Sequence, residues 1–365
     1  MGFKTGIIGL PNVGKSTLFN ALTKSNNAQA ENFPFCTIDP NVGEVPVPDN
    51  RLQKLSSMAN SKEVIPAKMT FVDIAGLVEG ASKGEGLGNK FLANIRECDA
   101  LAHVIRCFEN ENVTHVNQVI NPVSDIDIIN TELLLADLES VNKRIDNHKK
   151  KSKEADVQLI SLEFLEKAKA LLEEGTHVRN GSFNEEELVM KKYSQLLTSK
   201  PMLFICNVDE DSVVSGNQFS KSVEEAANSL DSKTINISVS IEQELSELTD
   251  PDELQSFLNE MGMMTAGLDK FINQGYMLLD LCTYFTVGPK ETKAWTINRN
   301  TCAPEAAGKI HTDFQKGFIR AETVSYGDYV ECGGWAKAKE SGKLRSEGKE
   351  YIVKDGDILN FLFNK

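Results

Sequence analysis

The alternation of apolar runs and helical spacings divides the chain into three parts. In residues 1–125, and again from about residue 200, short apolar runs are separated by stretches with helical spacing. The strands expected from these runs are Thr5–Leu10, Val42–Val47, Met69–Ile74, Ala100–Phe108, Met202–Val208 and Thr234–Val239. Ala100–Phe108 is apolar almost throughout, which is typical of a parallel strand covered on both faces. Strands separated by helices predict an α/β fold with a doubly wound, mainly parallel sheet.

The stretch between these two halves has little strand signal. Apolar residues recur at helical spacing in Thr131–Arg144 and in Val157–Leu172, and the basic turn Lys149–Lys153 lies between them. We therefore expect residues 126–199 to form an antiparallel helical hairpin, or coiled coil, inserted into the α/β domain. The basic turn is either solvated surface or a contact for a partner.

From about Leu279 the pattern changes again. Short apolar runs are separated by glycines and polar loops, and a helix is expected at Ala306–Phe314. The expected strands are Tyr284–Val287, Ala294–Ile297, Tyr351–Val353 and Ile358–Phe363. These runs predict a separate α+β module at residues 279–365, which leaves residues 1–125 and 200–278 for the α/β domain.

Composition and charge narrow the class of protein. The chain has 365 residues, more than one core usually serves, and a formal net charge of −14. The acidic balance argues against a dedicated nucleic-acid coat or a binder of anionic membranes, although it is compatible with one local basic face. The seven cysteines are scattered without a C-x-x-C pair, which predicts reduced thiols. No apolar run reaches transmembrane length, so we expect a cytoplasmic protein without a membrane partner.

One motif organises the first part of the chain. Gly9–Ser16 reads G-x-x-x-x-G-K-S and lies between an apolar strand and a helical spacing, as a phosphate-binding P-loop requires. Loop N–H groups and the helix N-terminus bind phosphate oxygens. Lys15 would reach the β- and γ-phosphates, and Ser16 would coordinate Mg²⁺. The residues expected to contact the nucleotide here are Asn12, Val13, Gly14, Lys15, Ser16 and Thr17.

A second set of residues is expected to sense the γ-phosphate. Asp73 ends an apolar strand and can bind the Mg²⁺ shell, and the Gly76 N–H can bond the γ-phosphate. Thr37 is the candidate residue for completing the Mg²⁺ shell, because its loop offers a single hydroxyl. The glycine-rich segment Gly80–Gly88 predicts a switch that orders on the γ-phosphate.

The base-recognition motif bears on the choice of nucleotide. P-loop GTPases usually carry Asn-Lys-x-Asp after a late strand, whereas this chain has Asn207-Val-Asp-Glu. Val208 replaces the lysine that would cover the base, and the longer Glu210 moves its carboxylate off the guanine edge. Adenine would instead be read by the Asn207 amide and the backbone at Val208, with Ser238 closing the pocket. The motif therefore favours ATP over GTP.

The residue after Gly76 bears on hydrolysis. Many GTPases have a glutamine there to orient the attacking water, and this chain has Leu77. Either intrinsic hydrolysis is slow, or another group positions the water. His115 is the candidate, and with Lys15 and Gly76 it makes up the expected catalytic set. Asn12 adds the hypothesis that K⁺ supplies positive charge at the transition state.

Together these motifs resemble the YchF subfamily of Obg-like P-loop NTPases, and the resemblance covers essentially the whole chain. The segments that carry it are Gly9–Ser16, Asn32–Ile38, Asp73–Val78, Gly80–Asn89, Asn207–Glu210, Ala306–Phe314, Lys316–Ala321 and Tyr351–Asp357. It implies a nucleotide domain, an inserted helical coiled coil, and a C-terminal TGS domain of the ubiquitin-like β-grasp type.

The resemblance also carries expectations about activity. It implies ATP preference, Mg²⁺, slow hydrolysis and association with the ribosome, either its large subunit or the whole particle. It implies that Phe108 stacks against adenine, and it matches His115 to a loop histidine of the family.

The partners and the class of function have alternatives. Four basic residues close together in the C-terminal module would form a small positive face for RNA, or are scattered surface charge. They are Lys309, His311, Lys316 and Arg320. RNA contact is expected through this module and the helical hairpin. Beside an ATPase switch, two interpretations stay open: an Obg-type GTPase, and a nucleotide-gated scaffold with negligible turnover.

Overall fold

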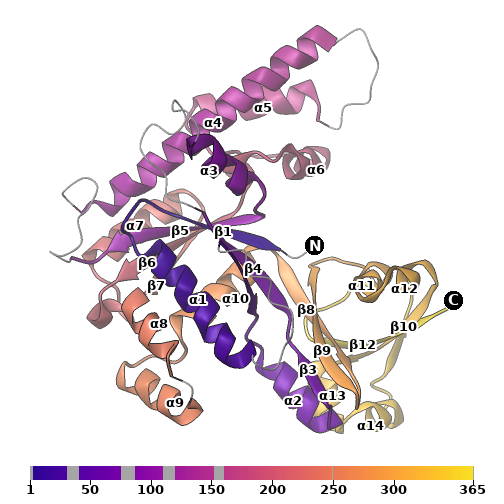
Figure 1. The fold of residues 1–365 in the computed structure, drawn as a ribbon. Coiled ribbons are helices and arrows are strands. Elements are labelled where there is room, and N and C mark those ends of the chain that lie inside the picture. The colour runs from indigo at the N-terminus through magenta and orange to yellow at the C-terminus, as the bar shows by residue number, and fades with distance from the viewer. Residues whose placement is uncertain are drawn as a thin grey trace. The chain divides into compact units, whose positions relative to one another are not determined.

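The computed structural model describes residues 3–30, 41–74, 87–109, 120–151, 160–248 and 250–364. The chain forms two compact units, whose elements are labelled in Figure 1. The first consists of Met1–Val45 and Thr70–Phe271, and the second of Pro46–Met69 and Ile272–Lys365. None of the described helices is long and apolar enough to cross a membrane.

The first unit is built on a six-stranded sheet in the order β2-β4-β1-β5-β6-β7. Its strands are β1 (Lys4–Ile8), β2 (Val42–Pro46), β4 (Lys68–Asp73), β5 (Ala100–Cys107), β6 (Met202–Val208) and β7 (Lys233–Ile237). The pairs from β4 through β1, β5 and β6 to β7 are all parallel. Every residue of β5 and β6 is buried, as their apolar sequences predict. The predicted doubly wound, mainly parallel sheet is confirmed.

Helices connect and cover these strands. Helix α1 begins at the end of the P-loop motif and contacts β1 and α8. Outside the helical insertion, the helices that accompany this sheet are α1 (Lys15–Ala30), α3 (Leu87–Arg96), α7 (Gln218–Ser229), α8 (Val239–Leu245), α9 (Pro251–Glu260) and α10 (Gly267–Leu278), with a 3₁₀ turn at Glu210–Ser212. The α10 N-terminus is capped by the buried Glu242 carboxylate, which accepts hydrogen bonds from the N–H groups of Gly267 (2.7 Å) and Leu268 (3.1 Å).

The predicted helical insertion is also confirmed. Its two arms, α4 (Pro122–Lys151) and α5 (Leu162–Glu173), lie side by side in Figure 1. Return elements follow at Val178–Asn180, α6 (Glu185–Ser194) and Leu197–Ser199. The arms share an apolar core that includes Val141, Phe164 and Leu165. Asp137 on α4 ties the return segment down, because its buried carboxylate accepts from the N–H groups of Leu197 (2.9 Å) and Thr198 (2.8 Å).

The second unit has its own six-stranded sheet in the order β11-β10-β12-β8-β9-β3. The strands are β3 (Glu63–Ile65), β8 (Leu281–Val287), β9 (Glu291–Asn298), β10 (Phe318–Ser325), β11 (Arg345–Glu347) and β12 (Asp357–Phe363). The helices are α2 (Asn50–Ala59), α11 (Ala303–Ile310), α12 (Thr312–Lys316), α13 (Tyr326–Cys332) and α14 (Trp335–Glu340). The expected α+β module is therefore present, and its TGS identity stays a prediction.

Two local predictions in this module are wrong. The helix expected at Ala306–Phe314 is broken into α11 and α12, because His311 has an extended backbone (φ −163°) and its Nδ1 accepts from the Asp313 N–H (3.2 Å). The strand expected at Tyr351–Val353 is reduced to an isolated bridge between Ile352 and Cys302. Strands β10 and β11 were not expected.

The second unit also includes a segment from the N-terminal part of the chain. Residues 46–69, expected within the α/β domain, group with the C-terminal residues. Strand β3 pairs in parallel with β9, and Arg51 on α2 forms ion pairs with Asp49 (2.8 Å) and Asp355 (2.7 Å). The Arg51 guanidinium also lies 5.3 Å from the centre of the Phe285 ring. The expected domain boundaries stay a prediction, and the compact units divide the chain differently at this segment.

Candidate functional site

The P-loop takes the strand–loop–helix form that its motif predicts. Strand β1 ends at Ile8, and α1 begins at Lys15. Gly14 has a φ of +92°, a conformation that L side chains rarely adopt. A Cβ at Gly9 would lie 2.7 Å from the Val104 carbonyl oxygen of β5, which the close packing of the loop does not allow. The two motif glycines are therefore required by geometry.

The key contact of the site joins the loop to the neighbouring strand. Asp73 at the end of β4 is in register with Ile7 of β1, so its carboxylate lies beside the P-loop. One carboxylate oxygen forms an ion pair with Lys15 Nζ, and the other accepts a hydrogen bond from Ser16 Oγ at 3.1 Å. The motif lysine, the motif hydroxyl and the strand-end carboxylate thus converge, although 57 residues separate Ser16 from Asp73.

These oxygen atoms fit a magnesium ion. Mg²⁺ prefers oxygen ligands and is usually held by one or two carboxylates together with substrate phosphates and waters. Ser16 Oγ and the Asp73 carboxylate provide adjacent oxygens beside a phosphate-binding loop. The donor set is therefore of the kind that Mg²⁺–nucleotide sites use.

Several predicted site residues lie outside the described part of the chain. They are Thr37, Gly76, Leu77 and His115, together with most of the glycine-rich segment after Gly80. Their expected roles in Mg²⁺ binding, γ-phosphate sensing and hydrolysis stay predictions. Of the remaining P-loop residues, Val13 is buried, whereas Asn12 and Thr17 are exposed at the loop and the start of α1.

Asn207 lies near the end of β6 and is held by the protein at both polar groups of its side chain. Its side chain is 4% exposed, its Nδ2 donates to the Val13 carbonyl (3.0 Å), and its Oδ1 accepts from the Val239 N–H (3.1 Å). The amide therefore ties the P-loop of β1 to the start of α8. Each polar group of the side chain thus has one protein partner, which gives the amide a tethering role, and its expected reading of adenine stays a prediction.

The other base-site residues surround this tether. Val208 is buried at the end of β6, and Ser238, also buried, precedes α8 with its Oγ 2.9 Å from Ser240 Oγ. Asp209 and Glu210 follow Val208 and are exposed. Phe108 directly follows β5, the strand paired with β6, and is partly exposed. The structure thus brings Phe108, Asn207, Val208 and Ser238 to the same edge of the sheet as the P-loop.

Sequence reasoning missed two residues at this edge. Arg106 is 1% exposed, and its guanidinium carbon lies 4.8 Å from the centre of the Phe108 ring. A basic residue within an otherwise apolar strand was a visible signal. Asn217, which begins α7, donates from Nδ2 to the Cys107 carbonyl (2.7 Å) and to Asp209 Oδ2 (3.1 Å). No local pattern predicts the contact of Asn217 with Cys107, because the two residues are 110 positions apart.

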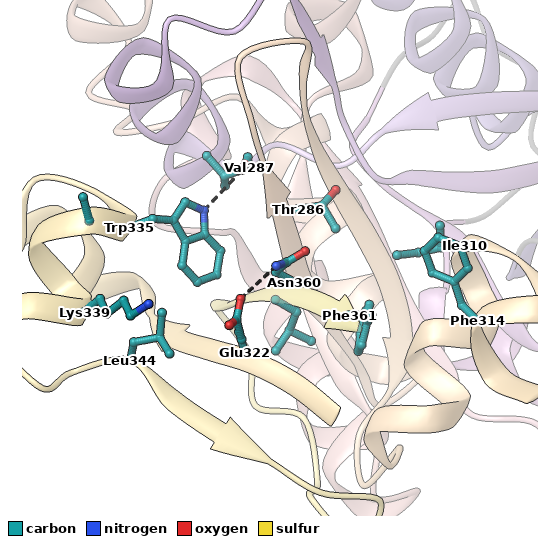
Figure 2. A pocket seen from close by; sticks show the side chains of 12 residues that line it. Thr286, Val287, Ile310, Phe314, Glu322, Trp335, Lys339, Leu344, Asn360 and Phe361 are labelled. Atoms are coloured by element: carbon teal, nitrogen blue, oxygen red, sulfur yellow. Dashed lines mark hydrogen bonds between the residues drawn. The ribbon is translucent and has the colours of Figure 1, made fainter. Parts of the chain in front are cut away.

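The second unit contains a cavity of about 600 Å³, whose lining is drawn in Figure 2. Trp335 Nε1 donates to the Val287 carbonyl (3.3 Å), and Asn360 Nδ2 donates to Glu322 Oε2 (2.9 Å). These lining groups thus bond one another around an apolar floor that includes Phe361. The polar groups that line the cavity are thus paired with each other, and they do not form the nucleophile–base pair of a reaction centre.

The expected basic face lies in the same unit. All four of its residues are exposed, on α11, α12 and the β10 strand or between them: Lys309, His311, Lys316 and Arg320. The His311 imidazole lies 3.4 Å from a carboxylate oxygen of Asp313, so the patch is not purely basic. Its contact with RNA stays a prediction.

The first unit is that of a P-loop nucleoside triphosphatase: a mainly parallel sheet carries a G-x-x-x-x-G-K-S loop whose lysine and serine face a strand-end aspartate. Residues 4–136 match the family model described as 50S ribosome-binding GTPase, and residues 281–364 match the model for the C-terminal part of YchF GTPases, described as a protein of unknown function.

Comparisons over the full length define the family. The chain is 51% identical to the ribosome-binding ATPase YchF of Bacillus subtilis and 52% identical to that of Escherichia coli O157:H7, with 100% of each chain covered. The solved structure of the Schizosaccharomyces pombe YchF GTPase superposes with a TM-score of 0.88 at 35% identity, covering 99% of this chain and 98% of that one. The chain belongs to the YchF family, as its motifs predicted.

Proposed function

We propose that this protein is a slow, Mg²⁺-dependent ATPase that binds the ribosome in a nucleotide-dependent way. The observation that carries the proposal is the Asp73 carboxylate, which contacts both Lys15 and Ser16. That contact joins the phosphate-binding loop to the strand that leads into the expected switch. The names of the Bacillus and Escherichia relatives support both the ATPase activity and the binding to the ribosome. Because the proposed partner is the ribosome, we also propose a cytoplasmic location.

Each residue has a role in the proposed activity. The P-loop N–H groups and Lys15 bind the β- and γ-phosphates and balance their charge. Ser16, Thr37 and Asp73 would hold Mg²⁺, which would supply positive charge to the phosphate oxygens when bound. Gly76 senses the γ-phosphate, and His115 positions the attacking water in place of the glutamine that Leu77 replaces.

The choice of ATP rests on the base site. The aspartate of Asn-Lys-x-Asp proteins accepts two guanine hydrogen bonds, and this chain has the exposed Glu210 instead, at the start of a 3₁₀ turn. With the Asn207 amide engaged by the protein, adenine would be recognised by stacking on Phe108 and by the backbone at Val208. The matching family model is described as a GTPase, so GTP is the competing substrate.

The test is a calorimetric titration with non-hydrolysable ATP and GTP analogues in Mg²⁺, followed by phosphate release with and without ribosomes. We expect tighter binding of the ATP analogue and faster hydrolysis on ribosomes. Lys15→Met should lower hydrolysis at least about 100-fold, since it removes a charge that stabilises the transition state. Lys143→Met, on the exposed face of α4, is the matched control and should leave the rate measured without ribosomes unchanged.

The outcomes separate the alternatives. Tighter GTP binding would replace the proposal by an Obg-type GTPase. A rate that stays at background with and without ribosomes, despite nucleotide binding, would favour a nucleotide-gated scaffold. Equal turnover in K⁺ and Na⁺ would remove the proposed role of Asn12 in K⁺ binding.

A further inference from the structure

Arg106 holds Phe108 from the inner side of the protein. Its Nε donates to the Phe108 carbonyl (3.2 Å), while its guanidinium carbon lies 4.8 Å from the ring centre. Arg106 is 1% exposed, whereas Phe108 is partly exposed. The ring face that Arg106 covers is therefore turned inward, and the accessible part of the ring is left for a ligand. A guanidinium stacks on aromatic rings because it is planar and cationic.

A second side chain holds the preceding peptide. Asn217 Nδ2 donates to the Cys107 carbonyl at 2.7 Å and to Asp209 Oδ2 at 3.1 Å. The Asn217 Oδ1 is engaged too, because it accepts from the Ser220 N–H as the cap of α7. One amide thus fixes the end of β5 against the loop of the base motif. Two consecutive carbonyls are therefore held by hydrogen bonds: that of Cys107 by Asn217, and that of Phe108 by Arg106.

The same arginine is coupled electrostatically to the helical insertion. Asp125, in the first turn of α4, is 1% exposed and exerts an attractive Coulomb interaction on the Arg106 guanidinium. Burial lowers the pKa of Arg106, and the nearby Asp125 carboxylate opposes that shift. A buried pair of opposite charges is costly to separate, because removing one partner leaves the other charge uncompensated.

We propose that Arg106 is a positioning residue for purine recognition, which holds the Phe108 ring as a stacking platform. The inference rests on the proposed nucleotide site and extends it to a specificity-determining residue. Lysine cannot replace arginine here, because an ammonium group can neither lie flat on the ring nor donate from a planar Nε.

The test is a double-mutant cycle with Arg106→Lys and Phe108→Ala, measured as affinity for a non-hydrolysable ATP analogue. Arg106→Lys should weaken that binding about tenfold, and Phe108→Ala by at least as much. In the Phe108→Ala background, Arg106→Lys should change the affinity less than twofold, because the two side chains act as a unit. Mg²⁺–tripolyphosphate, which has no base, should bind wild type and Arg106→Lys equally.

A matched control tests whether the effect is specific to Arg106. Arg144→Lys makes the same change at a half-buried arginine that bonds the Ser194 carbonyl in the helical insertion, and it should leave ATP binding unchanged. If Arg106→Lys unfolds, as judged by circular dichroism, the charge-neutral pair Arg106→Gln with Asp125→Asn takes its place in the same cycle.

The possible results are distinct. A tenfold loss that persists without the Phe108 ring, or an equal loss of tripolyphosphate binding, would overturn the inference. Unchanged affinity in Arg106→Lys would overturn it as well, while normal ATP binding by wild type would leave the proposed function intact. If wild type failed to bind the ATP analogue, that result would contradict both the proposed function and this inference.

Discussion

At the scale of single residues, the site depends on side chains that serve the protein and the ligand at once. Asp73 joins the lysine and the serine of the P-loop, and Asn207 joins that loop to the segment that follows β7. In both cases the side chain makes two contacts that no neighbour in the sequence could replace. The geometry of the phosphate site therefore rests on residues outside the motif itself.

Asn207 gives a prediction about stability. Asn207→Ala leaves the Val13 carbonyl and the Val239 N–H without these partners in a buried region, so we expect a loss of about 2–4 kcal/mol in the free energy of unfolding. Urea denaturation measures that loss. Asn360→Ala, which removes only an exposed bond to Glu322, should cost much less. Loss of ATP binding with unchanged stability would show instead that Asn207 reads the base.

At the scale of elements, a buried carboxylate stabilises the N-terminus of a helix. The α10 N-terminus is capped by Glu242, which is fully buried on α8. Burial raises the Glu242 pKa to about 7, although its two backbone hydrogen bonds act in the opposite direction. Asp269 raises this pKa and Lys270 lowers it, both from the start of α10. The capping carboxylate therefore titrates within the physiological range of pH.

This cap predicts a pH dependence of stability. Because the folded state raises the pKa of Glu242 above its usual value of 4.5, the folded state binds the proton more tightly, and stability is lost as the pH rises towards about 7. Glu242→Gln removes that titration. Relative to the variant, wild type should lose up to about 3 kcal/mol between pH 4.5 and 8. Urea denaturation across this range gives the two curves.

The control for this prediction lies on the same helix. Glu244 is exposed on α8, and Glu244→Gln should leave the pH dependence of wild type unchanged. Parallel curves for wild type and Glu242→Gln would contradict the assignment of the titration to Glu242.

At the scale of the whole molecule, the units do not follow the order of the chain. Residues 46–69 are separated from the C-terminal module by some two hundred residues, yet α2 groups with that module and β3 completes its sheet. Strand β3 has only three residues, so its own propensity is too weak to place it. Its pairing with β9 and the two ion pairs of Arg51 hold the segment there.

Arg51 gives a prediction about the second unit. Arg51→Met breaks both ion pairs, and we expect faster hydrogen–deuterium exchange in α2, β3 and β8, with no change in β5 and β6. Mass spectrometry of the exchanged protein locates the change. Arg299→Met disrupts a pair in the same unit that is more than half exposed, and should have little effect. Unaltered exchange at β3 in Arg51→Met would show that strand pairing alone anchors the segment.

Elements with a local signal can be predicted from the amino-acid sequence. The P-loop can be read from the chain because the spacing of its glycines, lysine and serine has a direct backbone consequence. Strands β5 and β6 can be read from it because strands buried on both faces are apolar almost throughout. The helical insertion was equally visible from its period. The family followed from these motifs and is confirmed by the full-length relatives.

Contacts between residues remote in the sequence could not be read from the chain. The tertiary structure broke the helix at His311, moved α2 and β3 into the second unit, and engaged the Asn207 amide within the protein. It also placed Arg106 on Phe108, where the sequence showed only a basic residue in an apolar strand. The physical reason is common to all of these cases. A hydrogen bond, a stacked ring or a strand pairing between remote residues depends on how the elements pack, and no local pattern records that packing.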